Sequence, residues 1–182
     1  AMTGTDIAGI ATGHDGAREP VAHWDFDIFA PAGALVTSSA DLAKFIAAAS
    51  GTVETELAPA FGTMLAETRV AGTDAIGLGW FVTNTGQGEI IWHNGGTGGF
   101  RAFAGFERNS GNGVVVLSNM STEMGIEDIG FHLLNPALPL REQPKLRTAV
   151  EVDPAIFAGY VGDYLLAPGI VISVTTKDNK LF

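Results

Sequence analysis

The segment 90–100 constrains the fold more than any other part of this chain. Ile90 and Trp92 alternate with Ile91 and His93, which predicts a strand, and a polar stretch with four glycines follows directly. Glycines let a backbone approach a ligand without obstruction by side chains. Another strand is expected to start at Phe100, so the segment indicates two strands joined by a glycine-rich turn at the wall of a site.

The order of residues here resembles the third motif of the serine penicillin-recognising hydrolases, the family of class C β-lactamases, DD-peptidases and β-lactamase-like esterases. Their Lys-Thr-Gly triplet occurs in many relatives as His-x-Gly, which corresponds to residues 93–95. Residues 30–45 resemble the family's loop into a helix, and residues 78–81 and 114–119 resemble its flanking strands. The resemblance covers residues 2 to 135 and identifies the chain as the carboxyl-terminal part of such a hydrolase.

The patterns and the resemblance predict an α/β fold of the α+β type. Its expected core is an antiparallel sheet with flanking helices, β-lactamase/transpeptidase-like and incomplete at both ends. Short Gly/Asn connections separate the expected strands, which are residues 77–83, 88–93, 100–107 and 113–118.

Three helices are expected around this sheet, and residues 1–36 before them are expected to be an irregular loop. A Ser-x-x-Asp capping pattern starts the first helix after Ser38, and Gly51 ends it. The second helix is expected over residues 54–70. The third follows Asn119, with Ser121 or Thr122 as its cap and Ile126, Ile129 and Leu133 beneath it.

Three segments are expected along the chain. Residues 1–135 form the carboxyl-terminal part of a β-lactamase-like domain, and the proline-rich, basic residues 136–149 form a linker. Residues 150–182 resemble the start of a small lipocalin-like β domain. That last segment is expected to be truncated, because a barrel needs about eight strands to close.

The resemblance also implies roles for residues of the glycine-rich segment. His93 takes the place of the family's motif-three cation, where it could orient a substrate carboxylate or relay a proton. Gly96 would give one backbone N–H to the oxyanion hole. The expected substrate-binding residues are Asn94, Gly95, Thr97, Gly98 and Arg101.

Simpler interpretations of the same residues stay open. His93 could be a strand-end histidine satisfied by backbone, the glycines a flexible hairpin turn, and Arg101 a side chain that points to solvent. A phosphate-binding loop is a weaker alternative, because the segment lacks a Gly-Lys-Ser/Thr ending and a strand follows it. The tryptophans Trp24, Trp80 and Trp92 are expected in the core.

The chain departs from the family pattern in its missing nucleophile. None of its serines has a lysine three residues later, and Tyr160 and Tyr164 both follow the glycine-rich segment. The Ser-x-x-Lys and Tyr-x-Asn motifs are therefore absent, and the chain alone is expected to be inactive. Two hypotheses remain, a fragment of a serine hydrolase acting on β-lactam, D-alanyl peptide or small-ester carbonyls, and a non-catalytic module that self-associates or binds a small ligand.

Composition limits the partners. With 20 acidic and 10 basic residues the formal charge is −10, which argues against nucleic acid and anionic membranes, and no apolar run reaches the length of a membrane span. The spacing of His14, His23 and Asp25 matches no metal motif, and no cofactor is expected. The resemblance implies an extracytoplasmic parent enzyme.

The expected partners are a small acyl substrate in the complete enzyme and either the missing amino-terminal segment or a second copy of the chain. The reason is Val114–Leu117, four branched aliphatic residues expected at an unpaired sheet edge. Such an edge favours a homo-oligomer over a monomer.

Overall fold

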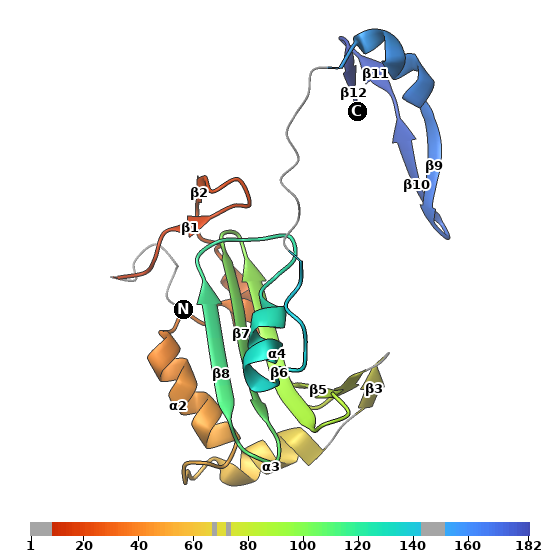
Figure 1. The fold of residues 1–182 in the computed structure, drawn as a ribbon. Helices are drawn as coiled ribbons and strands as arrows, with labels where there is room; N and C mark the ends of the chain where they lie inside the picture. The colour runs from red at the N-terminus through yellow and green to blue at the C-terminus, as the bar shows by residue number, and fades with distance from the viewer. Residues whose placement is uncertain (1–8, 67–68, 72–73, 143–151) are drawn as a thin grey trace. The chain divides into compact units, whose positions relative to one another are not determined.

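The computed structural model describes residues 9–66, 69–71, 74–142 and 152–182. It divides the chain into two compact units, Ala1–Arg141 and Glu142–Phe182, which are described separately. The first unit holds the sheet and the glycine-rich segment (Figure 1).

The first unit is built on a six-stranded antiparallel sheet with strand order β3-β4-β5-β6-β7-β8. The strands are β3 (Arg69–Ala71), β4 (Asp74–Ile76), β5 (Phe81–Asn84), β6 (Glu89–Thr97), β7 (Phe100–Glu107) and β8 (Gly113–Ser118). The expected antiparallel fold with flanking helices is confirmed. Strands β3 and β4 are additional, and β3 occupies residues that the sequence assigned to the end of a helix.

The glycine-rich segment is a strand for most of its length, so the prediction of a turn from Asn94 onward is wrong. β6 continues to Thr97, and Asn94–Thr97 pair with Phe103–Phe100 of β7. Only Gly98 and Gly99 form the turn. Glycine has a weak strand preference, but the continuous ladder with β7 holds this stretch extended.

Helices cover both faces of the sheet. α2 (Ser39–Ala49) packs on one face of β7 and β8, where Ile46, Ile91 and Phe106 are almost fully buried. The Ser38 cap is confirmed, because its side chain accepts a hydrogen bond from Asp41 N at 3.1 Å. α3 (Ala58–Ala66) adds Phe61 to the same core and is shorter than the helix expected over 54–70.

α4 (Glu127–Leu134) covers the other face, against β6, β7 and β8. Its side chain Phe131 packs on Trp92 and Phe103, with ring centroids 5.0 and 5.6 Å away. A Cβ on the buried Gly130 would collide with Phe103. Contact with the sheet therefore depends on Gly130 and Phe131.

Two expectations for α4 are corrected. The helix begins at Glu127 without a side-chain cap, and neither Ser121 nor Thr122 starts it. Of the residues expected beneath it, Ile126 is buried, but Ile129 and Leu133 are 40% and 59% exposed. The predicted helix is present, but a different side of it faces the sheet, because Phe131 packs on Trp92 and Phe103.

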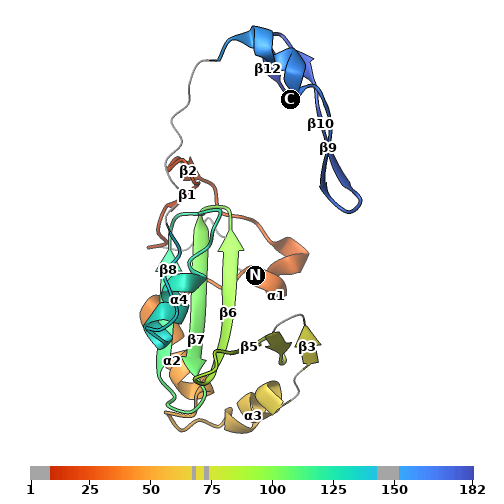
Figure 2. The same cartoon turned by 45° about the vertical axis from the view of Figure 1, so that its right-hand side comes forward.

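Residues before α2 are not wholly irregular. They contain β1 (Gly13–His14), β2 (Pro20–Val21), a 3-10 turn η1 (Asp27–Phe29) and the short α1 (Ala30–Gly33). Trp24 was expected in the core, but its side chain is 56% exposed, whereas Trp80 is 5% exposed and Trp92 is half-buried. Figure 2 shows β5 running beside only part of β6.

β8 is an edge strand, as the sequence predicted for Val114–Leu117. In the described sheet it pairs with β7 alone. The Glu107 N–H donates to Asn112 O, and hydrogen-bonded pairs alternate along an antiparallel ladder. Even-numbered residues of β8 therefore bond to β7, and the backbone N–H and C=O groups of Val115 and Leu117 point away from the sheet.

The second unit contains the 3-10 helix η2 (Pro154–Tyr160) and two hairpins. One joins β9 (Gly162–Ala167) to β10 (Ile170–Val174), and the other joins β11 (Thr176–Lys177) to β12 (Lys180–Leu181). Strands were expected in this region. The assignment of residues 136–149 as a linker lies partly outside the described residues, and the lipocalin-like assignment remains a prediction.

Candidate functional site

The carboxyl-terminal half of β6 forms an open edge of the sheet. Arg108 N donates to Glu89 O, so odd-numbered residues of β6 bond toward β7, and even-numbered residues bond toward β5. The pairing with β5 ends at Trp92. Among the described residues, Asn94 and Gly96 therefore have no neighbouring strand on that side, and the Gly96 N–H points out from the edge.

His93 lies at the start of this open edge. Its side chain is exposed, its ring stacks on Phe81 at a centroid distance of 5.3 Å, and its Nδ1 lies 2.6 Å from Asn94 O. A carbonyl oxygen only accepts, so Nδ1 carries the proton in this hydrogen bond. In the neutral imidazole, Nε2 is then free to accept a proton.

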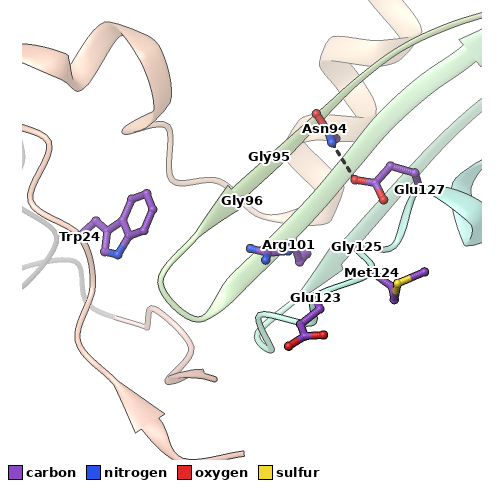
Figure 3. Close-up of a pocket in the computed structure, with 9 residues that line it drawn as sticks. All are labelled: Trp24, Asn94, Gly95, Gly96, Arg101, Glu123, Met124, Gly125 and Glu127. Carbon is purple, nitrogen blue, oxygen red and sulfur yellow. Dashed lines mark hydrogen bonds between the residues drawn. The ribbon is translucent and has the colours of Figure 1, made fainter. Parts of the chain in front are cut away.

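The Asn94 side chain connects β6 to α4. Its Nδ2 donates to Glu127 Oε1 at 2.7 Å (Figure 3). Arg141 Nη2 donates to Glu127 Oε2 at 3.2 Å. Burial of the Glu127 carboxylate opposes ionisation. The hydrogen bonds from Asn94, from its own backbone N–H and from Arg141, with the Arg141 charge, nevertheless hold the pKa of Glu127 below its ordinary value.

A pocket of about 420 Å³ opens beside this connection (Figure 3). It is lined by Trp24, Asn94, Gly95, Gly96, Arg101, Glu123, Met124, Gly125 and Glu127. The Arg101 guanidinium is held by backbone, because Nε donates to Thr122 O at 3.1 Å and Nη1 donates to Phe100 O at 3.1 Å. Arg101 is half-buried, and its contact with a substrate carboxylate stays a prediction.

The glycines of the segment differ in whether the structure requires glycine at their position. Gly99 has φ +106°, and a Cβ there would stand 2.6 Å from Val21 Cγ2, so packing of the described chain requires glycine. A Cβ on Gly95 would meet only Ala102 Cβ at an ordinary 3.6 Å. At Gly96 it would stand 2.8 Å from Arg101 Nη1, so the guanidinium would have to shift. Backbone conformation does not require glycine at positions 95 and 96.

The structure brings part of the predicted site together. Asn94, Gly95, Gly96 and Arg101 line the pocket, whereas His93, Thr97 and Gly98 are outside its lining. The sequence did not indicate Trp24 or Glu127 as neighbours of this segment. Glu127 lies 33 residues after Asn94 in the chain. Acidic residues are common in the first turn of a helix, so the presence of Glu127 there did not predict a contact with Asn94.

The match to the Beta-lactamase family model extends over residues 3–135, and the chain belongs to this family. The antiparallel sheet flanked by helices agrees with that assignment. The chain is also similar to penicillin-binding protein 4* of Bacillus subtilis (strain 168), at 30% identity over 112 residues. That similarity covers 58% of this chain and 25% of the relative, so the chain spans about a quarter of the relative's length.

Two further observations concern partners and metals. Among the residues described here, no helix has the length and apolar character that crossing a membrane requires. Within the same ranges, histidine and carboxylate side chains do not gather in groups of three or more that could hold a metal ion.

Proposed function

We propose that this chain supplies the strand side of the acyl-transfer site of a β-lactamase-family serine hydrolase. The observation that carries the proposal is the outward N–H of Gly96 on the open edge of β6, three residues from His93. Such an N–H can stabilise the oxyanion of a tetrahedral intermediate. The His93 Nε2 can accept a proton or a substrate hydrogen bond beside it.

The substrate class follows from family membership and remains part of the proposal. It comprises β-lactam, D-alanyl peptide and small-ester carbonyls. The chain carries no Ser-x-x-Lys or Tyr-x-Asn motif, so the nucleophile has to come from another segment. The chain alone should therefore form no covalent adduct with a penicillin or a fluorophosphonate probe, and a stoichiometric mass increase on one of its own serines would contradict this assignment.

The positive test is reconstitution. A segment with Ser-x-x-Lys and Tyr-x-Asn is added to the chain, and hydrolysis of a chromogenic β-lactam and of a small ester is followed. Activity should appear, and His93→Ala should lower kcat/KM by about 10²-fold or more. An unchanged kcat/KM in His93→Ala would leave His93 as a structural residue.

A second candidate, a self-associating module, is supported by the edge strand β8. Val115 and Leu117 direct unpaired backbone groups outward, and Val114–Leu117 contains no charge that would oppose the addition of another strand. An antiparallel strand can pair with its own copy about a two-fold axis. Sedimentation of the purified chain at micromolar concentration tests this candidate, and a compact monomer would contradict it.

A further inference from the structure

The pocket beside Gly96 has two apolar walls that come from segments far apart in the chain. One wall is the indole of Trp24, which lies between β2 and η1 and is 56% exposed. The other is the thioether side chain of Met124, which lies between β8 and α4 and is 50% exposed. The Arg101 guanidinium lies between these two side chains in Figure 3. All three side chains therefore line the same volume as Gly96.

The indole of Trp24 is held at this wall by the turn between β6 and β7. A Cβ on Gly98 would collide with Nε1 and Cδ1 of the indole, so this edge of the ring packs directly on the turn. The neighbour His23 stacks on Phe100 at a centroid distance of 5.0 Å, and the Phe26 ring lies 6.0 Å from the indole. A large aromatic side chain that is already fixed loses little conformational entropy when a ligand binds to it.

The loop that carries Met124 is also held in place. Arg101 Nε donates to Thr122 O at 3.1 Å, and Thr122 Oγ1 donates to Gly125 O at 3.2 Å, so the loop is hydrogen-bonded on both sides of Met124. The same guanidinium is held at the pocket because its Nη1 donates to Phe100 O at 3.1 Å. The pocket is thus formed before a ligand enters, as is usual for small-molecule sites.

The three side chains share a preference for aromatic rings. An indole stacks on another ring or meets its edge, and a thioether sulfur makes favourable contacts with a ring. A guanidinium is attracted to the face of a ring. A saturated group of the same size would keep the apolar contacts with Trp24 and Met124 but would lose the attraction to Arg101.

We propose that this pocket binds a neutral aryl side group of the acyl substrate, which makes Trp24 a specificity-determining residue. The carboxylates of Glu123 and Glu127 lie in the same lining and offset the charge of Arg101, so a neutral ring fits better than an anionic one. The proposal rests on the proposed function, because Gly96, the oxyanion donor assigned there, lines the same pocket.

Binding is tested on the chain alone, through the ¹H–¹⁵N NMR signals of its three indole N–H groups. Phenylacetamide, a neutral aryl probe that cannot acylate a serine, is titrated into the ¹⁵N-labelled chain. The Trp24 signal, assigned by its absence in Trp24→Phe, should shift saturably, whereas the signals of Trp80 and Trp92, which do not line the pocket, should stay in place. Cyclohexylacetamide, of similar size but without a π system, should bind at least about threefold more weakly.

Two variants separate the indole from its surroundings. Trp24→Ala should weaken phenylacetamide binding at least about fivefold, read from the backbone N–H signals of Gly96 and Gly125. Ile28→Ala is the matched control, because it removes a 78% exposed side chain of the same segment that does not line the pocket, and it should bind like the wild-type chain. Unchanged Trp80 and Trp92 signals show that a variant has kept its fold.

Three results would overturn the proposal: a Trp24 signal that does not respond to phenylacetamide, equal affinity for the two amides, or wild-type affinity in a folded Trp24→Ala chain. If Trp24→Ala disturbs the Trp80 and Trp92 signals, the comparison of the two amides on the wild-type chain decides.

The reconstituted complex extends the test to turnover. The ratio of kcat/KM for a phenylacetyl ester to that for an acetyl ester should fall at least about fivefold in Trp24→Ala. Specific binding of phenylacetamide, combined with a complex that hydrolyses neither ester, would support the aryl pocket and count against the proposed function. Hydrolysis of both esters without binding of phenylacetamide would do the reverse.

Discussion

Asn94 Nδ2 lies 2.7 Å from Glu127 Oε1 and joins the glycine-rich strand β6 to the first turn of α4. The contact connects residues 33 positions apart in the chain. It puts a charged, largely buried carboxylate directly behind the open edge where the Gly96 N–H is exposed. The segment is therefore held by a side-chain hydrogen bond to α4 in addition to its backbone ladder with β7.

The first prediction is that Asn94 and Glu127 are energetically coupled. In a double-mutant cycle of Asn94→Ala and Glu127→Ala, the coupling in the free energy of unfolding should be about 1–2 kcal/mol, because a hydrogen bond to a charged group is lost only once in the double mutant. Urea unfolding measures it. Asn112→Ala, in the exposed β7–β8 turn, is the matched control and should be additive with Glu127→Ala.

The second prediction concerns pH. Because the pKa of folded Glu127 lies below its ordinary value of 4.5, the carboxylate stabilises the fold above about pH 4.5, and this stabilisation is lost as the pH falls through the folded pKa. The stability difference between the wild-type chain and Glu127→Gln should therefore be constant near neutral pH and shrink below pH 4.5. A difference that grows on acidification would contradict the assigned ionisation.

The third prediction separates the Gly96 N–H from the Gly96 backbone. Gly96→Pro removes an N–H that faces the open edge and leaves the ladder with β7 intact. In the reconstituted complex it should lower kcat by about 10²–10³-fold. Gly96→Ala retains the N–H and should keep more of the activity than Gly96→Pro, although the Arg101 guanidinium, which lies 2.8 Å from the new Cβ, has to shift. Equal rates for both variants would exclude Gly96 as an oxyanion donor.

The fourth prediction is structural. Gly99→Ala should destabilise the chain by about 1–3 kcal/mol, because Gly99 has φ +106° and packs closely on Val21 and Gly13. Gly95→Ala should change the free energy of unfolding by less than about 0.5 kcal/mol, because the new methyl group meets only Ala102. Thermal unfolding compares the two. Similar losses would mean that Gly95 is packed more tightly than this structure shows.

The fifth prediction concerns the edge of β8. If the chain self-associates through this strand, Leu117→Lys should weaken association at least about tenfold, since a charge on an open edge opposes pairing. Val70→Lys, on the opposite edge strand β3, replaces a valine that is 86% exposed and serves as the control. Sedimentation velocity distinguishes them, and loss of association in Val70→Lys alone would assign the contact to β3.

The elements that could be predicted from the amino-acid sequence are those with local signals. Ser38 caps α2 by accepting from the Asp41 N–H three residues later, and the alternation around Ile90 and Trp92 predicts a strand. The resemblance at residues 93–95 identified the family for the same reason, because the motif is contiguous. Interactions over a few residues do not need the rest of the fold to be known.

The length of β6 and the side chains that contact it from α4 depend on packing between distant segments. Glycines suggest a turn locally, but pairing with β7 holds Asn94–Thr97 extended, and the early end of β5 leaves their other side open. Glu127 reaches Asn94 because Phe103 and Gly130 set the phase of α4 against the sheet. Such contacts join residues far apart in the chain. The sequence contains many acidic, aromatic and glycine residues that could have made them, and only the packing of the folded chain determines which ones do.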